Sequence, residues 1–318
     1  MNSLVSICIP TYRRPALLRE AIESCLQQTY REIEILVGDD SQDDASARMV
    51  QALGRSDVIR YFQNKPALRQ AENINRLLDL AKGSRLVLLH DDDLLLPDAV
   101  ESLLGCWQKE PGITAAFGKQ YLITMSGEVL LKDSEVLNEG YHRRAALAGL
   151  QESSLKSALV CQFPNNGYLI LTEAARTTRY SDRPEVGDYC DLDFGLRLAS
   201  RYERFYFIDR YTAKYRLTDS SISKVNLRAD LIYRLIQSVP LPEDLEPVRA
   251  DCLRANAWPA LNSLLALGDM RAAFEIYSSR HYGLSRRLSP RGLAQGLLLA
   301  APTRFSMALM SAWRRLRR

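Results

Sequence analysis

The sequence predicts a doubly wound α/β sheet with parallel strands, followed by a helical C-terminal extension. Over the first 110 residues, apolar strand patterns alternate with amphipathic helix patterns, which is typical of a parallel sheet covered by helices. Beyond about residue 225 only helix patterns remain. Ligands of open α/β sheets bind outside the carboxyl ends of the strands, so the residues that directly follow the strands are the first candidates for a site.

Four strand–helix pairs make up the alternation. The strands are expected at 4–9, 33–37, 58–62 and 86–89, and the helices at 16–28, 45–53, 71–81 and 97–108. The first helix carries its apolar residues on one stripe. The fourth strand is apolar on both faces, which indicates a position in the middle of the sheet.

The pattern becomes less regular after Pro111. Short strands are expected at 115–118, 121–123 and 167–171, a turn at 126–128, and an amphipathic helix over about 138–160. Further helices are expected in the second half of 187–199 and at 227–238, 245–267 and 270–279. Pro259 is expected to kink or split the 245–267 helix.

Three consecutive aspartates follow the central strand. Like charges crowded at a strand end repel one another and resist desolvation, which a bound cation would relieve. Asp91 and Asp93 point to the same side of an extended chain, and hard oxygen ligands suit Mg²⁺ or Mn²⁺. The alternative is a solvated acidic turn ahead of a helix.

Two other strands also end in oxygen-rich loops. Thr11 follows the first strand, and Asp39 and Asp40 follow the second. Because the carboxyl ends of parallel strands meet at one edge, we expect these residues to converge with the aspartate triplet. A third acidic group, Asp188, Asp191 and Asp193, surrounds a helix start, where carboxylates also serve the helix N-terminus without any other function.

Composition restricts the class of protein. The chain of 318 residues and 36.0 kDa can bury a large core, as one domain or one domain plus an appendage. Its six cysteines are scattered without a Cys-x-x-Cys pair, and the N-terminus lacks the pattern of a signal peptide, so we expect reduced thiols and a cytoplasmic protein. Nine arginines and no acidic residue lie from Arg280 onward, while the remaining chain is acidic, which excludes a nucleic-acid binder.

Several nucleotide-binding and hydrolase signatures are absent from the sequence. The first strand is not followed by Gly-x-Gly-x-x-Gly, and neither Gly-x-x-x-x-Gly-Lys-Ser/Thr nor Gly-x-Ser-x-Gly occurs. These absences disfavour a dehydrogenase, a P-loop protein and an α/β-hydrolase. A bound diphosphate would therefore be held mainly by metal.

Seven motifs in fixed order carry a family resemblance. They lie at 6–15, 28–30, 34–41, 81–83, 90–93, 190–199 and 215–217. From about residue 3 to about residue 224, the chain resembles the family 2 glycosyltransferases, which are inverting enzymes with a GT-A fold. The resemblance implies a GT-A-type doubly wound mixed sheet with a Rossmann-like nucleotide-binding half.

The resemblance also implies a domain division. A glycosyltransferase domain is expected at 1–224, with the nucleotide-sugar-binding half at 1–110 and the acceptor-binding half at 111–224. A helical region with a basic amphipathic tail is expected at 225–318.

The resemblance assigns roles to individual residues. Asp191 is the implied catalytic base, and Asp91, Asp92 and Asp93 are the implied ligands of Mn²⁺ or Mg²⁺. The implied donor-binding residues are Pro10, Thr11, Tyr12, Arg13, Asp39, Asp40, Arg69, Asn73, Asp91 and Asp92. The chain departs from the family pattern with Arg13 in place of Asn, Pro66 in place of Gly, Cys190 in place of Glu, and Thr218 in place of a His that ligates metal in relatives.

The implied reaction transfers a sugar from a nucleoside-diphosphate sugar to a hydroxyl of a glycan or lipid-linked acceptor. A UDP- or dTDP-sugar donor and a pathway of bacterial surface polysaccharide synthesis are the expectations. The alternatives are a nucleotidyltransferase, which would need a Gly-rich basic loop after the first strand, and a non-catalytic module that binds nucleotide sugars. A phosphatase with an Asp nucleophile would need its Asp-x-Asp at the N-terminal strand.

The tail, residues 293–318, combines apolar side chains with arginines. Pro302 and Arg304 interrupt the apolar run before it reaches the ~20 residues of a membrane span. A basic amphipathic segment suits an anionic membrane surface, and peripheral contact at the inner face of the cell membrane is one expectation. The other is a helix packed on its own domain.

Overall fold

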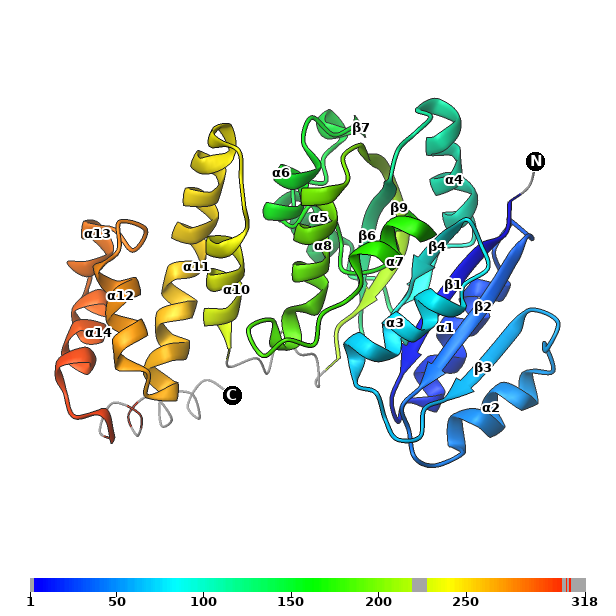
Figure 1. The fold of residues 1–318 in the computed structure, drawn as a ribbon, viewed down its shortest axis with the longest axis horizontal. Helices are drawn as coiled ribbons and strands as arrows, with labels where there is room; N and C mark the ends of the chain where they lie inside the picture. Colours follow the sequence, from blue (N-terminus) through cyan, green and yellow to red (C-terminus); the bar gives the residue numbers. More distant parts are fainter. Residues whose placement is uncertain (1–2, 219–227, 305–306, 308, 310–318) are drawn as a thin grey trace. The chain divides into compact units, whose positions relative to one another are not determined.

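The computed structural model describes residues 3–218, 228–304, 307 and 309. These residues form two compact units, which are drawn together in Figure 1. The first contains 3–182 and 190–218, and the second contains 183–189 and the described residues from 228 onward. The expected domain boundary at residue 224 lies outside the described residues, and the division into a donor and an acceptor half stays a prediction.

The first unit is built on a nine-stranded mixed sheet within the described residues. Its strand order is β3-β2-β1-β4-β8-β6-β9-β5, and β7 pairs with β9. Four parallel neighbours come first: β3 (Ile59–Gln63), β2 (Ile33–Asp39), β1 (Val5–Thr11) and β4 (Arg85–Leu88). These are the four strands that the alternating pattern predicted.

The second half of the sheet breaks the expectation of parallel strands throughout. β8 (Leu169–Leu171) runs antiparallel to both β4 and β6 (Ala115–Ile123), and β6 runs parallel to β9 (Phe205–Arg216). Two-residue strands, β5 (Leu94–Leu95) and β7 (Gly149–Leu150), pair antiparallel with β9. The sheet is therefore mixed, as the family resemblance implied.

The parallel strands share a buried core. Ile7, Val37 and Val87 on three adjacent strands are fully buried in one core cluster. Gly83 lies just before β4, and a Cβ there would lie 2.6 Å from the carbonyl oxygen of Leu4. Only glycine lets the chain pass this close to β1, so the entry into the central strand is fixed by the sequence.

The helices of the first half match the expected pattern. They are α1 (Pro15–Leu26), α2 (Ala45–Leu53), α3 (Gln70–Leu80) and α4 (Ala99–Lys109). The expected helix over 138–160 is wrong. That stretch holds the end of α5 (Leu131–Gly140), a 3₁₀ turn (Ala145–Leu147), β7 and α6 (Ser154–Leu159). A turn at 141–144 interrupts the apolar periodicity, and Ser153 starts a new helix by accepting a hydrogen bond from the Lys156 amide.

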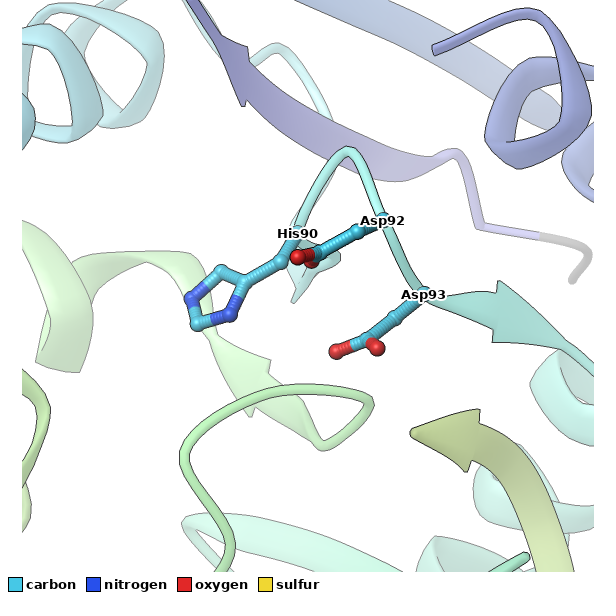
Figure 2. A group of neighbouring side chains, drawn as sticks. All are labelled: His90, Asp92 and Asp93. Atoms are coloured by element: carbon cyan, nitrogen blue, oxygen red, sulfur yellow. The ribbon is translucent and has the colours of Figure 1, made fainter. Parts of the chain in front are cut away.

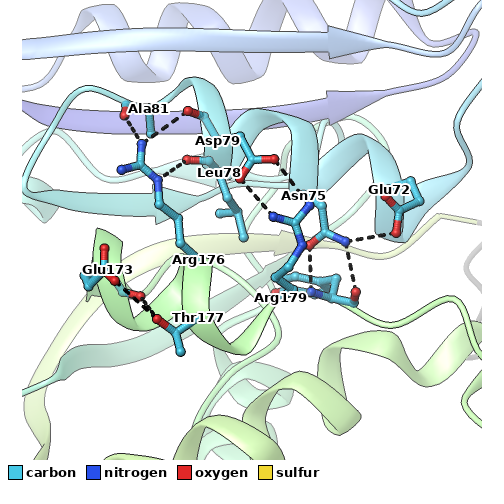
Figure 3. A network of polar contacts seen from close by, with 10 residues as sticks. Glu72, Asn75, Leu78, Asp79, Ala81, Glu173, Arg176, Thr177 and Arg179 are labelled. Atoms are coloured by element: carbon cyan, nitrogen blue, oxygen red, sulfur yellow. Dashed lines mark hydrogen bonds and ion pairs between the residues drawn. The ribbon is translucent and has the colours of Figure 1, made fainter.

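A polar network fastens α7 (Thr172–Thr178) to α3. Figure 3 shows Arg176 reaching the last carbonyl groups of α3, with Nε donating to the Leu78 oxygen at 2.9 Å. Arg179 pairs with Asp79 at 2.9 Å. Asn75 bonds both the amide and the carbonyl of Tyr180, at 2.7 and 2.9 Å.

The same attachment fixes α8 (Cys190–Arg201), which follows. The Tyr180 ring stacks on Phe194 of α8 with the ring centroids 4.3 Å apart, and its hydroxyl lies 2.8 Å from that of Tyr168. The start of α8 is thus oriented by contacts that begin at α3.

The second unit is helical. It contains α10 (Ala229–Ser238), α11 (Glu246–Leu267), α12 (Met270–Ser278), α13 (Leu284–Arg287) and α14 (Pro290–Ala300). Pro259 lies inside α11 and does not split it. Most of the tail beyond Arg304 lies outside the described residues, and none of the described helices is both long enough and apolar enough to cross a membrane.

Candidate active site

Asp91 joins the ends of β1 and β4. The Thr11 hydroxyl donates to Asp91 Oδ2 at 2.7 Å, and Arg14 contacts Asp91 and Asp92 at 3.3 and 2.9 Å. Arg14 directly precedes α1, so the first strand and first helix both contribute to this cluster. The expected convergence of Thr11 with the aspartate triplet is observed.

Asp93 is held from the opposite half of the sheet. Its Oδ1 accepts from the Arg216 amide at 2.8 Å, and its Oδ2 accepts from Asn166 Nδ2 at 2.8 Å. Arg216 is 1% exposed, and its guanidinium donates to the carbonyl oxygens of Asp92 and Met125 and pairs with Glu20. The aspartate loop is therefore fixed by β9 as well as by β4.

Among the described residues, one group of three has its ligand atoms within 4.8 Å of one another: His90, Asp92 and Asp93. Figure 2 shows these side chains projecting to one side of the loop between β4 and β5. Two carboxylates and one imidazole suit a divalent transition ion. Buried polar atoms without a hydrogen-bond partner at the same place, such as His90 Nε2, fit a site completed by a ligand.

Crowding and burial shift the pKa values of the side chains in this cluster. Burial, reinforced by the charge of Asp92, raises the pKa of Asp93 to about 7, and the same causes raise the pKa of Asp91. Burial opposes the charged form of His90, but the carboxylates of Asp191, Asp93 and Asp92 outweigh it and raise the pKa to about 9. Groups with such shifted pKa values concentrate at functional sites.

Asp191 lies in the first turn of α8, next to this cluster. Its Oδ1 is 3.8 Å from His90 Nε2, which is within ion-pair range and too long for a hydrogen bond, and neither atom has a hydrogen-bond partner among the described residues. Asp193 instead pairs with Arg197 at 2.6 Å, and Asp188 is exposed. Of the three aspartates around this helix start, Asp191 is the one that faces the cluster.

The loop after β2 is built differently from the sequence-based expectation. Both oxygens of Asp39 are used inside the protein, by the Ser41 amide at 2.7 Å and by the Tyr61 hydroxyl at 2.6 Å. Asp40 Oδ1 accepts from Asn64 and from the Leu68 amide, so Asp40 fixes the loop before α3. Their roles in donor binding stay predictions.

The remaining expected donor-binding residues divide into buried and exposed ones. Asn73 is 2% exposed and donates to the Gly38 carbonyl at 2.8 Å, where a Cβ on residue 38 would collide with it. Tyr12 is 51% exposed, and Arg13, with a positive φ of 55°, lies over its ring. Pro10 is half-buried in β1, next to the buried Thr11, and Arg69 directly precedes α3 with a φ of 71°.

Sequence reasoning missed four residues that build the site: Arg14, His90, Asn166 and Arg216. Arg14, His90 and Arg216 all lie within the motifs, so a signal was present without a role attached to it. Asn166 comes from a loop between α6 and β8 and carries no sequence signal, because only the fold brings it to Asp93.

Solved structures share the fold of this chain. The mannosyltransferase PcManGT from Pyrobaculum calidifontis, solved with GDP-Man and Mn²⁺, has a TM-score of 0.60 at 15% identity and covers 99% of this chain and 88% of its own. S. aureus TarS 1–349 in complex with UDP-GlcNAc has a TM-score of 0.61 at 15% identity and covers 92% of this chain and 78% of its own. The GT-A fold implied by the resemblance is confirmed.

The sequence comparisons support the family resemblance. Residues 6–147 match the family model described as glycosyl transferase family 2, so this part of the chain is similar to the family 2 glycosyltransferases. The GalNAc(5)-diNAcBac-PP-undecaprenol beta-1,3-glucosyltransferase of Campylobacter jejuni is 33% identical over 147 residues, 43% of this chain and 47% of its own length. Escherichia coli chondroitin synthase is 23% identical over 243 residues, 73% of this chain and 32% of its own length. The chain spans less than half the length of these two curated relatives.

Proposed function

We propose that this protein transfers a sugar from a nucleoside-diphosphate sugar to an acceptor hydroxyl with inversion at the anomeric carbon. The observation that carries the proposal is the position of Asp191, beside the cluster formed by His90, Asp92 and Asp93. The Asp191 carboxylate thus lies beside the cluster but is not part of it, and the cluster is suited to bind a cation and a diphosphate. That arrangement fits an acceptor hydroxyl activated at the edge of a donor site.

Asp191 is the proposed base. It lies in a partly exposed position at the start of α8, where an acceptor hydroxyl can approach from solvent. A carboxylate accepts the hydroxyl proton late in the reaction, as the new glycosidic bond makes the oxygen more acidic. The attachment of α8 through Tyr180 and Phe194 keeps this carboxylate in place, and such positioning supplies part of the rate enhancement.

Asp92 and Asp93 are the proposed cation ligands, with Asp91 beside them. A bound Mn²⁺ or Mg²⁺ supplies charge neutralisation for the departing diphosphate. Thr11 and Asp91 are the proposed ribose contacts, since their hydrogen-bonded side chains lie at the adjoining ends of β1 and β4. Asp40, Tyr12 and Arg13 are proposed to line the base and ribose side of the same donor.

The acceptor is proposed to be a glycan or a lipid-linked sugar in bacterial surface polysaccharide synthesis. The name of the Campylobacter relative includes a polyprenol-diphosphate-linked acceptor, and that of the Escherichia coli relative a polysaccharide product. A UDP- or dTDP-sugar is the first donor to test, with a GDP-sugar as comparison, because solved neighbours hold UDP-GlcNAc and GDP-Man.

Contact with a membrane surface is part of this proposal. α14 exposes Leu293 and Leu297, at 52% and 73%, while Gly292 and Gln295 are buried, and Arg291 is exposed beside them. Apolar side chains flanked by arginines suit an anionic lipid surface. Flotation with phosphatidylglycerol vesicles tests this: the Leu293→Glu, Leu297→Glu double variant should float less than wild type and less than Leu131→Glu, an exposed control on α5. Equal flotation of all three contradicts membrane docking.

The decisive assay incubates the protein with UDP-, dTDP- and GDP-sugars, Mn²⁺ and extracted glycolipid acceptors, and identifies the products. Release of a nucleoside diphosphate with growth of the acceptor supports glycosyl transfer. Pyrophosphate release would indicate nucleotidyl transfer instead. Binding without product over the whole panel, with an unreacted acceptor, would favour the non-catalytic binding module.

A further inference from the structure

His90 lies between the aspartate cluster, which is the proposed cation site, and Asp191, which is the proposed base. Its Nδ1 lies 3.5 Å from Asn166 Nδ2, which itself donates to Asp93 Oδ2 at 2.8 Å. Its Nε2 lies 3.8 Å from Asp191 Oδ1. The two ring nitrogens therefore face different partners: Nδ1 faces the aspartate cluster and Nε2 faces the proposed base. Figure 2 shows one ring nitrogen directed toward Asp93 and the other directed away from it.

Asn166 provides an independent sign that this group is built for a ligand. It is fully buried, its amide nitrogen contacts both His90 and Asp93, and its Oδ1 has no hydrogen-bond partner in the part of the chain that the structure describes. A buried amide oxygen without a partner is costly unless something completes it. Rotation of the amide would present this oxygen, a hard ligand, to the same space.

We propose that His90 ligates the divalent cation through Nδ1, together with Asp92 and Asp93, and donates Nε2–H to Asp191. One imidazole would then connect the cation to the proton acceptor. The inference rests on the proposed function for the cation and for Asp191, and adds a role for His90 in holding both. Histidines that bind metal commonly donate their second ring N–H to a carboxylate, which fixes the ring and its tautomer.

The geometry needs only a small adjustment. Shortening the 3.8 Å separation between Nε2 and Asp191 Oδ1 to a hydrogen bond takes a shift of about 1 Å. Asp191 keeps its second carboxylate oxygen for the acceptor hydroxyl. Asp191 is thus placed by a residue of the cation group, and His90 acts on it as a positioning residue.

Two consequences separate this arrangement from an all-oxygen site. A nitrogen ligand favours Mn²⁺ and Co²⁺ over Mg²⁺, because imidazole suits the transition ions better than the hard ion. Asp191, although it is not a ligand, should contribute to Mn²⁺ affinity by orienting His90, and its replacement should lower that affinity about tenfold.

The test measures Mn²⁺ on the full-length chain, without a histidine tag and in buffer free of imidazole. Titration followed by electron paramagnetic resonance, with UDP or GDP present, gives the affinity. Electron spin-echo modulation then detects a ¹⁴N nucleus bound to Mn²⁺. Wild type should show the nitrogen signal, and His90→Asp should keep Mn²⁺, lose the signal and gain affinity for Mg²⁺ relative to Mn²⁺.

The chain offers matched controls, because His142 and His281 are its other histidines. His142→Asn and His281→Asn should retain the signal, and Asp191→Asn should retain it with weaker Mn²⁺ binding. Bound Mn²⁺ without a nitrogen signal in wild type overturns the role of His90 and leaves the proposed function standing. Absence of any Mn²⁺ binding with either nucleotide contradicts both.

Discussion

The backbone amide of Arg216 donates a 2.8 Å hydrogen bond to Oδ1 of Asp93, which lies 123 residues earlier in the chain. The Arg216 side chain continues from there to the Asp92 carbonyl at 2.9 Å and the Met125 carbonyl at 2.6 Å. A single buried residue at the end of β9 therefore holds the aspartate loop against the rest of the first unit.

Replacing Arg216 should damage both stability and the site. Arg216→Ala removes several hydrogen bonds at a side chain that is 1% exposed, including those to the Asp92 and Met125 carbonyl groups. We expect a loss of about 2–4 kcal/mol in the free energy of unfolding, measured by urea denaturation. Arg210→Ala, on the same strand and paired with Asp98 in an exposed ion pair, should cost less than about 1 kcal/mol. Similar losses in the two variants would contradict the role assigned to Arg216.

Asp191→Asn should separate binding from turnover. The amide keeps the shape of the side chain and cannot accept the acceptor proton, so at saturating Mn²⁺ we expect turnover to fall by about 10²–10⁴-fold with little change in the KM for the donor. Asp188→Asn, an exposed neighbour before the same helix, should behave as wild type. Steady-state kinetics with a reactive donor check this, and near-normal turnover of Asp191→Asn would remove it as the base.

Arg14→Met should strengthen Mn²⁺ binding in the absence of nucleotide. Arg14 pairs with Asp91 and Asp92 and is partly exposed, so it competes with a cation for the same carboxylates. Removing its charge should favour Mn²⁺ by about 1 kcal/mol, or roughly fivefold in affinity. Arg19→Met, on α1 with an exposed ion pair to Glu23, is the control. Unchanged or weaker Mn²⁺ binding in Arg14→Met would show that Arg14 does not compete.

Glu34 should make stability depend on acid pH. Burial opposes its charge, but hydrogen bonds from Ser6 and the Lys82 amide and the pairing with Arg60 outweigh burial and hold the pKa of Glu34 below its ordinary value. Because the pKa is lower in the folded chain, the stabilisation is present above the unfolded value of ~4.3 and is lost as the pH falls through the folded value.

Glu34→Gln should therefore be less stable than wild type near neutral pH, by about 1–3 kcal/mol, and the difference should shrink below pH ~4. Unfolding by urea at several pH values measures it. Glu23→Gln, which removes an exposed carboxylate, should follow the wild-type pH dependence. A constant difference between Glu34→Gln and wild type at every pH would contradict the assigned cause.

The parallel half of the fold could be predicted from sequence because its signals are local. Each strand from β1 to β4 is rich in apolar residues and is followed by a polar loop, and the meeting of Thr11 with Asp91 follows from strand order alone. The antiparallel strand β8 could not be placed in this way, because pairing between β4 and β6 depends on the path of the chain. The prediction of one helix over 138–160 was wrong because the apolar periodicity gives no sign of the turn at 141–144.

The site, like the fold, could be predicted only where the signal in the sequence is local. Motif positions located the aspartates, but their partners come from distant loops: Asn166 reaches Asp93 from the loop before β8, and Arg216 from the end of β9. Asp39 stands in a motif and directly after a strand, and the motif does not reveal its hydrogen bonds with Ser41 and Tyr61. Its role in donor binding stays a prediction.

The most direct test of the central claim is the thermal unfolding of wild type and Asp93→Asn with UDP or GDP, with and without Mn²⁺. A nucleotide at a concentration 100 times its dissociation constant adds about 2.7 kcal/mol to the free energy of unfolding. This corresponds to a rise of roughly 5–10 °C in Tm for a unit of this size. We expect this rise in wild type only with Mn²⁺ and a nucleoside diphosphate together, and its loss in Asp93→Asn. A Tm that no combination changes, or an equal rise in both proteins, would contradict the claim that these carboxylates bind a cation and a nucleotide sugar.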